Sequence, residues 1–310
     1  MQRAIITGAT GVIGTALIQE LIQNDIEVLV FCREGSVRND RIPEHPLVEK
    51  CYCNLKQLSE IQNKSGKIYD VFYHLAWAGT TGQARNDMYL QEQNIRYALD
   101  AVGVAKSFGC HTFIGIGSQA EYGRVEGILR PDTPTFPDNG YGFAKLTSGL
   151  MTREYANQLG MKHIWVRILS IYGPNDGMQS MVMSVIRSAL EGEQPKCTRG
   201  EQKWDYLYSK DAAYALKCLG DNGKDRKIYV LGSGKVTRLS DYIIKICENV
   251  NKKIKPNLGA IPYAPKQVMY LEADTANLKE DINFVPRYSF EKGIKETIQW
   301  VKETLQDEKN

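Results

Sequence analysis

Short apolar runs alternate with longer amphipathic stretches over the first half of the chain. Short, continuously apolar runs are typical of strands that are buried on both faces. The runs are "RAIIT" (3–7), "IEVLVFCR" (26–33), "VEKCYCNL" (48–55), "YDVFYHLAW" (69–77) and "HTFIGIGS" (111–118). Apolar residues at helical spacing, such as Leu17, Leu21 and Ile22, predict helices over 14–25 and over 89–109. The pattern therefore predicts buried strands that alternate with helices.

A glycine-rich turn joins the first strand to the first helix, with Gly8, Gly11 and Gly14 spaced G-x-x-G-x-x-G. A helix N-terminus presents unpaired N–H groups and a partial positive charge, which attract phosphate. The glycines permit the tight turn, the approach of a pyrophosphate and the close packing of the helix. We therefore expect a dinucleotide here, and the alternative is a glycine turn that binds no ligand. The predicted contacts come from the turn itself: Gly8, Thr10, Gly11, Val12, Ile13 and Gly14.

The end of the second strand bears on the choice between NADP and NAD. An acidic residue at this place hydrogen-bonds the adenosine ribose and favours NAD, whereas an arginine accommodates the 2′-phosphate of NADP. Here the strand ends at Arg33, and Ser36 follows closely. A guanidinium binds phosphate through charge-assisted paired hydrogen bonds. We therefore predict NADP, bound by Arg33 and Ser36; in the alternative, Glu34 is the acidic residue that counts and the cofactor is NAD.

Residues at the ends of the next two strands are candidates to line the same cofactor, since ligands of doubly wound sheets bind beyond the carboxyl ends of the strands. The candidates are Asn54 and Leu55 after the third strand, and Leu75, Ala76 and Trp77 after the fourth. His74 lies inside the fourth apolar strand. We interpret His74 as a buried core residue rather than a catalytic one.

A serine and a Tyr-x-x-x-Lys pair supply candidate acid–base chemistry. Ser118 ends the fifth strand, and Tyr141 and Lys145 are four residues apart, so that on a helix they share one face. The lysine charge favours the phenolate and is expected to lower the pKa of Tyr141 from its usual value of roughly 10. A tyrosine tuned in this way can pass a proton to or from an alcohol oxygen while a hydride moves. We expect Ser118 to hydrogen-bond the same oxygen.

Composition excludes several other classes of function. The 310 residues carry a net charge of +3 without runs of lysine and arginine, so nucleic-acid binding is not indicated. We find no apolar stretch long enough to span a membrane, no leader segment ahead of the first strand, and expect a cytoplasmic protein. The seven cysteines and four histidines lack the spacing of a metal site or a redox pair. We therefore expect reduced thiols and no metal.

In its motifs the chain resembles the extended short-chain dehydrogenases/reductases of the NAD(P)-dependent nucleotide-sugar epimerase/dehydratase family. The motifs follow the family's order over nearly the whole chain: "TGATGVIG" (7–14), "HLAWAG" (74–79), Asn94, "GSQAEYG" (117–123), "YGFAK" (141–145), "RILSIYGP" (167–174), "WDYLYSKDAA" (204–213), "YVLGSG" (229–234), "FVPRYSFEKGI" (284–294) and Trp300. The resemblance implies an α/β fold with a doubly wound parallel (Rossmann) sheet and a smaller C-terminal α/β substrate domain. The implied division is 1–174 plus 211–234 for the Rossmann domain and 175–210 plus 235–310 for the substrate domain.

The family's functional residues carry over onto matching positions. Its catalytic Ser/Thr, Tyr and Lys correspond to Ser118, Tyr141 and Lys145. Further residues implied by the resemblance are Asn94, Leu169 and the Tyr141–Lys145 pair for the cofactor, and Trp77, Gln119, Ser170, Lys203 and Trp204 for the substrate. The helices around 88–108 and 142–159 resemble the pair that forms the family's dimer interface, which implies a homodimer.

Departures from the family's patterns narrow the reaction. The sugar dehydratases, and decarboxylases with a similar glutamate, place a carboxylate just after the catalytic serine, where this chain has Gln119 and Ala120. Glu121 comes one place later, and alternation along an extended segment turns it to the other side. The epimerase-reductases that act on carbons 3 and 5 have a cysteine at the position of Ala120. These departures disfavour dehydration, decarboxylation and 3,5-epimerisation.

Two reactions need no further acid or base. The first is NADPH-dependent 4-keto reduction of a nucleoside-diphosphate-4-keto-6-deoxyhexose with Tyr141 as the acid, and Arg33 favours it. The alternative is an NAD-dependent nucleotide-sugar 4-epimerase that is similar to UDP-glucose 4-epimerase. A further alternative, from a different class, is a non-catalytic redox sensor that binds NADP.

The expected substrate is a nucleotide sugar, although one position departs from the family. Trp204 stands where relatives often place an arginine that meets the nucleotide diphosphate. Lys203 or Arg199 is the replacement candidate for binding phosphate. In the alternative interpretation Trp204 packs between the domains. Because the phosphate position is altered, a second alternative is that the substrate is a non-nucleotide carbonyl compound.

Overall fold

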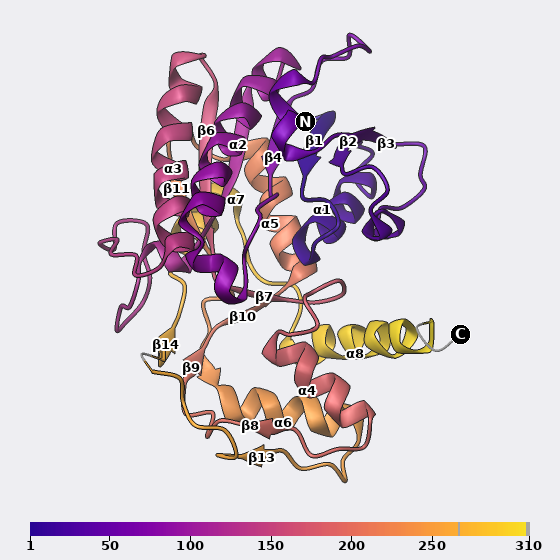
Figure 1. Ribbon diagram of the computed structural model, residues 1–310, viewed down its shortest axis with the longest axis vertical. Coiled ribbons are helices and arrows are strands. Elements are labelled where there is room, and N and C mark those ends of the chain that lie inside the picture. Colours follow the sequence, from indigo (N-terminus) through magenta and orange to yellow (C-terminus); the bar gives the residue numbers. More distant parts are fainter. Residues whose placement is uncertain (266, 308–310) are drawn as a thin grey trace.

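The computed structural model describes residues 1–265 and 267–307, and it shows a larger body above a smaller one (Figure 1). The larger body is built on a seven-stranded sheet whose neighbouring strands are all parallel. In spatial order the strands are β11 (Ile228–Leu231), β6 (Lys162–Ile168), β5 (Thr112–Ser118), β4 (Val71–His74), β1 (Arg3–Thr7), β2 (Glu27–Cys32) and β3 (Val48–Tyr52). The order reverses between β1 and β4, which places the topological switch point at their carboxyl ends.

Helices cover both faces of this sheet. On one face lie α1 (Val12–Ile22), α5 (Ser209–Asn222) and α7 (Ala276–Ile282), and on the other α2 (Met88–Ser107) and α3 (Gly140–Gln158). Successive side chains of β1 point to opposite faces: Ala4 and Ile6 join the first layer, and Ile5 joins the second. Burial of both faces explains why the strands are continuously apolar. The predicted doubly wound parallel sheet is confirmed.

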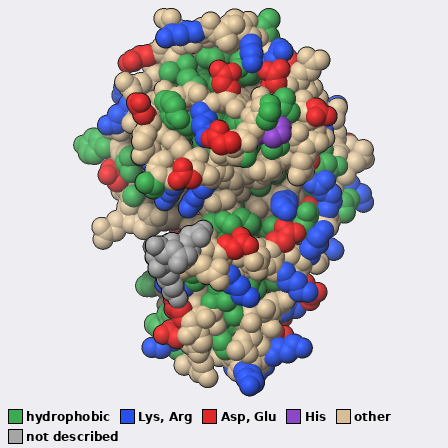
Figure 2. All heavy atoms as spheres, turned by 90° about the vertical axis from the view of Figure 1, so that its right-hand side faces the viewer, with side chains coloured by type: hydrophobic (Ala, Val, Ile, Leu, Met, Phe, Trp, Pro, Cys, Tyr) green, Lys and Arg blue, Asp and Glu red, His purple; other side chains and the backbone are tan. Residues whose placement is uncertain are grey.

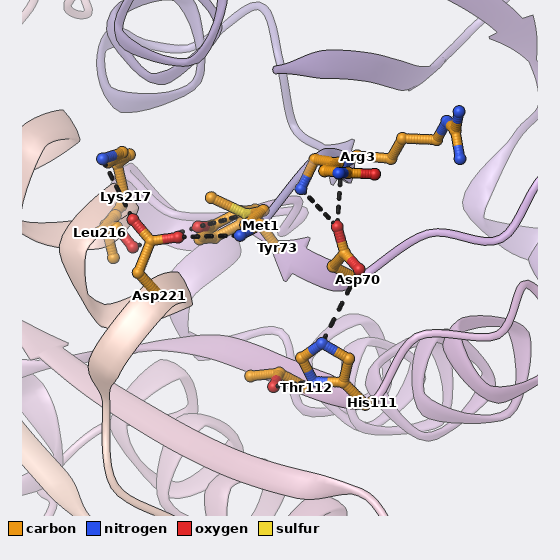
Figure 3. A network of polar contacts seen from close by, with 10 residues as sticks. Met1, Arg3, Asp70, Tyr73, His111, Thr112, Leu216, Lys217 and Asp221 are labelled. Carbon is orange, nitrogen blue, oxygen red and sulfur yellow. Dashed lines mark hydrogen bonds and ion pairs between the residues drawn. The ribbon is translucent and has the colours of Figure 1, made fainter. Parts of the chain in front are cut away.

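Polar contacts join neighbouring elements at the amino edge of the sheet (Figure 3). Asp70, just before β4, accepts a hydrogen bond from the backbone N–H of Arg3 at 2.9 Å. His111 Nε2, just before β5, lies 3.9 Å from the same carboxylate. The Tyr73 hydroxyl donates to the carbonyl of Leu216 on α5 at 3.2 Å. These contacts hold β1, β4, β5 and α5 in register at the edge opposite to the glycine turn.

The smaller body has its own apolar core. Its helices are α4 (Met181–Leu190), α6 (Leu239–Val250) and α8 (Phe290–Asp307). They bury Ile186, Ile243 and Ile294 against one another. Small sheets complete the smaller body and connect it to the larger one. One pairs β8 (Lys196–Cys197) with β13 (Asn257–Leu258), and another pairs β7 (Ser170–Tyr172) with β10 (Tyr206–Tyr208). In a third, β9 (Lys203–Trp204) lies between β12 (Thr237–Arg238) and β14 (Tyr270–Leu271).

The division into a Rossmann and a substrate domain stays a prediction, and one segment packs differently from it. The sequence assigns residues 235–310 to the substrate domain. In the structure α7 lies against α5 and β11, and Leu278 and Phe284 belong to the core of the larger body. The chain therefore returns to the larger body after β14, before α8 joins the smaller one.

Short 3₁₀ helices form several of the loops: η1 (Val37–Arg41), η2 (Leu55–Glu60), η3 (Gly82–Asn86) and η4 (Gln119–Glu121). Figure 2 shows acidic and basic side chains interspersed over one face, and the outline narrows between the two bodies. Among residues 1–265 and 267–307, no helix combines the length and the apolar character needed to cross a membrane. Within the same residues, no group of three or more His, Cys, Asp or Glu is arranged to hold a metal ion.

Candidate active site

The glycine-rich turn lies at the switch point, between the end of β1 and α1. Gly8 has a φ of +73°, and a Cβ there would lie 2.6 Å from the backbone nitrogen of Ala76. A Cβ on Gly14 would collide with the carbonyl oxygen of Gly8, so the glycine lets α1 pack against the turn. Helix α1 starts after Gly11 with no side-chain cap from the described part of the chain. Its first N–H groups are therefore available to an anion such as a pyrophosphate.

A cleft of about 490 Å³ opens beside this turn, at the carboxyl ends of β1, β2, β3 and β4. Among the residues that line it are these predicted cofactor contacts: Gly8, Thr10, Arg33, Ser36, Asn54, Leu55, Ala76 and Trp77. Sequence reasoning missed other lining residues, which include Arg38, Asn39, Lys56, Gln93 and Tyr97. A cleft of this size at a switch point fits an elongated dinucleotide.

Other predicted cofactor residues lie beneath the surface. The side chains of Val12, Ile13 and Leu75 pack against the core under the turn. Leu169 is buried in a separate cluster that includes Tyr122. We therefore expect these residues to contact a cofactor mainly through their backbone atoms.

Two arginines line the end of the cleft at β2, and a third, Arg41, contacts the glycine turn from outside the cleft. Ser36 caps η1 by accepting the backbone N–H of Arg38 at 3.4 Å. Arg41 donates from Nη1 to the carbonyl of Thr10 at 3.2 Å, and burial together with the neighbouring Arg38 lowers the pKa of Arg41. Arg33 and Arg38 themselves line the cleft. Arg38 and Arg41 are both visible in the sequence, in the segment "RNDR" (38–41). Only the 3₁₀ helix η1 shows that they face the glycine turn.

Two buried amides on α2 hold the loop that follows β4. Asn94 accepts the backbone N–H of Ala78 and donates to the carbonyl of the same residue, both at 2.9 Å. Gln91 accepts the indole N–H of Trp77 at 2.9 Å and donates to the carbonyl of Ala84 at 2.9 Å. Each amide is 1% exposed. Asn94 thus acts through the loop that it holds, and Gln91, which no motif singles out, orients the Trp77 indole.

The structure brings Ser118, Tyr141 and Lys145 together at the carboxyl end of β5. Ser118 ends β5 and lies close enough to Tyr141, in the first turn of α3, to favour the deprotonated form of that tyrosine. Lys145 lies one turn later, and its Nζ is 5.8 Å from the centroid of the Tyr141 ring. The Trp77 ring lies 3.7 Å from Lys145 Nζ and meets the Tyr141 ring edge-on, with centroids 6.0 Å apart. Because Trp77 also lines the cleft, this group adjoins the cleft through Trp77.

The charge states of this group differ from the expectation that Lys145 lowers the pKa of Tyr141. Burial is the largest influence and raises the pKa of Tyr141 above its ordinary value, while Ser118 and the Arg85 guanidinium act in the opposite direction. Burial also lowers the pKa of Lys145 to about 7. The lysine is 4% exposed and donates to the carbonyl of Ile116 at 2.6 Å. The expectation is corrected because Lys145 shares the helix face but directs its ammonium group toward β5.

Glu121 lies away from the site, for a different reason from the predicted one. The segment after Ser118 is not extended but forms η4, and Glu121 accepts the backbone N–H of Ser118 at 2.8 Å. Glu121 is fully buried, 2.7 Å from Arg167 Nε and 3.0 Å from the Trp165 indole nitrogen. A carboxylate held in this way is not available for acid–base work on a substrate.

His74 is a core residue, as predicted. It is 3% exposed, its ring stacks on Phe113, and Nδ1 lies 3.0 Å from the Thr7 hydroxyl. Burial lowers the pKa of His74 to about 3, so the imidazole stays neutral. The Thr7 hydroxyl also accepts the backbone N–H of Ala76 at 3.3 Å, which fixes the end of β4 beside β1.

The predicted substrate residues lie between the two bodies or beside Ser118. Trp204 donates its indole N–H to the Ser170 hydroxyl at 2.8 Å, which links β9 to β7. The Trp204 ring is partly buried against the cores of both bodies, in agreement with the packing alternative. Lys203 is exposed on β9, and Gln119 opens η4.

The chain belongs to the NAD dependent epimerase/dehydratase family, whose model matches residues 4–232. dTDP-glucose 4,6-dehydratase of Xanthomonas campestris is 25% identical over 199 residues, which are 61% of this chain and 57% of that protein. The chain thus spans little more than half the length of the dehydratases that it matches. UDP-N-acetyl-alpha-D-glucosaminuronate decarboxylase of Bacillus cytotoxicus is 25% identical over an alignment of 332 residues with its gaps, which covers 99% of each chain.

Solved structures with the same fold include 4-epimerases. UDP-N-acetylglucosamine 4-epimerase of Methanobrevibacter ruminantium has a TM-score of 0.87 at 22% identity, with 98% of this chain and 99% of that chain covered. UDP-glucuronic acid 4-epimerase of Bacillus cereus, solved with NAD, has a TM-score of 0.85 at 19% identity, with 98% of each chain covered. The predicted family is confirmed, and the neighbours show the same fold. The predicted 4-keto reduction and NADP are not confirmed.

Proposed function

We propose that this chain transfers a hydride at carbon 4 of a nucleotide sugar, and that Tyr141 carries the proton of the oxygen on that carbon. One observation carries the proposal: the Tyr141 ring contacts Trp77 edge-on, and Trp77 lines the cleft that the glycine turn opens. When bound there, NAD or NADP takes or gives the hydride. Ser118 hydrogen-bonds the sugar oxygen, and Tyr141 accepts or returns its proton.

The chain's own residues fit a dinucleotide along the whole cleft. The first N–H groups of α1 suit the pyrophosphate, and Asn54 and Leu55 suit the adenine. Ala76 and Trp77 line the opposite end of the cleft, toward Tyr141. The substrate then approaches from Gln119, Ser170, Lys203 and Trp204, on the side of the smaller body.

The first candidate reaction is 4-epimerisation with NAD. 4-Epimerases recur among the proteins that share this fold. The reaction removes and returns one hydride at carbon 4 and one proton at the oxygen bonded to it, so Tyr141 suffices as the acid and base. Glu121, the carboxylate next to Ser118 in the sequence, is held in a buried ion pair, which argues against the elimination of water.

One observation favours a second candidate, NADPH-dependent reduction of a nucleoside-diphosphate-4-keto-6-deoxyhexose. Arg33 and Arg38 line the cleft near Ser36, and Arg41 reaches the carbonyl of Thr10. The two arginines in the cleft, Arg33 and Arg38, stand where the adenosine ribose of a bound dinucleotide is expected. A 2′-phosphate would neutralise them through charge-assisted hydrogen bonds.

The cofactor content of the purified protein separates the two reactions. The protein is denatured, and the released nicotinamide nucleotide is identified and quantified per chain. Near-stoichiometric NAD supports the 4-epimerase and contradicts the reductase, since an epimerase recycles its own hydride. A protein that releases no nucleotide supports the reductase, and assays of NADPH oxidation with 4-keto sugar nucleotides follow.

Tyr141→Phe is the matched variant for both reactions, because it removes the hydroxyl and keeps the ring that contacts Trp77. We expect turnover to fall by about 100-fold or more, with unchanged affinity for the cofactor. If the wild-type protein binds NADPH normally but converts no nucleotide sugar, the proposed enzymatic function is contradicted and the alternative of a redox sensor that binds NADP is favoured.

A further inference from the structure

We propose that Arg85 is a positioning residue for Tyr141, whose guanidinium lies over the tyrosine ring and stabilises its deprotonated form. The inference rests on the proposed role of Tyr141 as the proton carrier. Arg85 is absent from the motifs that identify the family, and its position beside the site becomes visible only in the structure.

The contact is a cation over the face of an aromatic ring. The central carbon of the Arg85 guanidinium lies 4.3 Å from the centroid of the Tyr141 ring. A cation at this distance is attracted by the negative face of a neutral phenol. When the hydroxyl loses its proton, the ring gains negative charge and the attraction to the same cation increases. Arg85 therefore favours the phenolate over the phenol.

The backbone holds Arg85 in this place. Arg85 belongs to η3, and its Nη1 donates to the carbonyl of Thr80 at 3.0 Å. Asn86 accepts the backbone N–H of Gly140 at 3.1 Å, which joins η3 to the first residue of α3. A Cβ on Gly140 would lie 2.9 Å from the Arg85 carbonyl oxygen, so the glycine permits this close approach. Tyr141 follows Gly140 directly, and the two elements fix the guanidinium relative to the ring.

Other charged groups around Tyr141 do not supply the same effect. Lys145, on the same helix, has a pKa lowered to about 7 by burial, so it is only partly charged at neutral pH. Glu121 of η4 acts in the opposite direction on Tyr141, and Arg167 offsets it at 2.7 Å. Ser118 of β5 contributes an uncharged hydroxyl. Arg85 places a guanidinium over the face of the Tyr141 ring at 4.3 Å from its centroid, closer than the Lys145 ammonium at 5.8 Å.

The test is a direct titration of Tyr141 that needs no substrate. The protein is labelled with 3-fluorotyrosine, whose phenol titrates at lower pH than that of tyrosine, and is followed by fluorine NMR. The chain has 17 tyrosines, and the resonance of residue 141 is assigned by its loss in Tyr141→Phe. The full-length variants Arg85→Met and Arg85→Lys are compared with the wild-type protein. Arg96→Met removes an equal charge from the exposed surface of α2 and serves as the matched control.

We expect Arg85→Met to move the titration of residue 141 upward by about half a pH unit or more. Arg85→Lys restores part of the difference, and Arg96→Met matches the wild-type protein. An unchanged midpoint in Arg85→Met, or an equal shift in Arg96→Met, overturns the inference. The other fluorotyrosine resonances show whether each variant keeps its fold. If those resonances move in Arg85→Met, the comparison of Arg85→Lys with the wild-type protein decides whether Arg85 acts on Tyr141.

The result is independent of the proposed reaction. A shifted titration in a protein that converts no nucleotide sugar contradicts the proposed function and leaves the electrostatic coupling standing. Turnover of a nucleotide sugar together with an unshifted titration contradicts the role of Arg85 alone. When a substrate is known, the pH profile of Arg85→Met is expected to move in the same direction as the titration.

Discussion

At the residue scale, the surroundings of a side chain decide its chemistry as much as its spacing does. Tyr141 and Lys145 share one face of α3, as their separation of four residues predicts. Yet the lysine ammonium lies under the Trp77 ring and donates to Ile116, whereas Arg85 covers the tyrosine ring. The cation that acts on Tyr141 thus comes from a segment more than fifty residues away in the sequence.

The buried Lys145 predicts a pH dependence of stability. Burial lowers its pKa from an ordinary 10.5 to about 7 in the folded protein. Between these two values the unfolded chain binds a proton that the folded chain has released, so stability rises with pH across this window. We expect Lys145→Met to stabilise the protein at pH 7 by on the order of 1 kcal/mol or more. The gain should shrink as the pH approaches 10, which thermal denaturation at several pH values measures.

Lys106→Met, at an exposed position of α2, is the control and should leave the melting temperature nearly unchanged. Equal destabilisation of Lys145→Met at pH 7 and at pH 10 would show that Lys145 is charged and favourably paired in the folded protein.

A second prediction at this scale concerns the choice of cofactor. We expect Arg38→Ala to weaken the binding of NADPH by about tenfold, because one charge-assisted contact with the 2′-phosphate is lost. Binding of NADH, which has no such phosphate, should change by less than about twofold. Titration of the cofactors by fluorescence measures both affinities, with Arg96→Ala as a control outside the cleft. Equal loss for NADPH and NADH would mean that Arg38 acts on a part common to the two molecules.

At the scale of elements, local patterns predict the strands and helices, and short turns escape them. β1, β2, β4 and β5 fall on the predicted apolar runs. η4 was predicted as extended chain, because three residues are too few to show a period. Its capping box, in which the Ser118 hydroxyl and the Glu121 carboxylate each accept a backbone N–H, turns Glu121 inward.

The packing of α1 against the glycine turn predicts the effect of Gly14→Ala. The new Cβ would collide with the carbonyl of Gly8 and the backbone of Ala9, so the helix must move. We expect a loss of about 1–3 kcal/mol in the free energy of unfolding and weaker binding of the dinucleotide. Urea denaturation and cofactor titration measure the two effects. Gly177→Ala is the control, since a Cβ there meets nothing within 4 Å; equal behaviour of the two variants would refute the packing argument.

At the scale of the whole molecule, the two bodies leave one face of the larger body uncovered. On α3 the side chains of Phe143, Leu150 and Met151 are 52%, 47% and 44% exposed. A groove beside them, between α2 and α3, includes Leu99 and Tyr155 among its lining residues. Exposed apolar surface of this kind marks an interaction site, and the family resemblance predicts a second copy of the chain on these two helices.

The predicted homodimer is tested by light scattering over a range of protein concentrations. We expect the mass of two chains for the wild-type protein. Leu150→Lys should shift the equilibrium toward one chain, because a charge is then buried in the interface. Lys253→Met, at an exposed position of the smaller body, leaves the mass unchanged. A mass of one chain at every concentration of the wild-type protein would overturn the prediction.

The sequence alone determined the features that depend on neighbouring residues. Apolar runs and helical periods predicted strands that alternate with helices, the family motifs implied the doubly wound sheet, the G-x-x-G-x-x-G turn predicted an anion site, and an apolar strand indicated that His74 is a core residue. These patterns are local, because backbone geometry sets their periods. Only the tertiary structure decided which groups lie together: Arg85 over Tyr141, Arg38 in the cleft, Arg41 on the Thr10 carbonyl, and Glu121 with Arg167. Such pairs join distant segments, and their directions follow from packing that no short stretch of sequence contains.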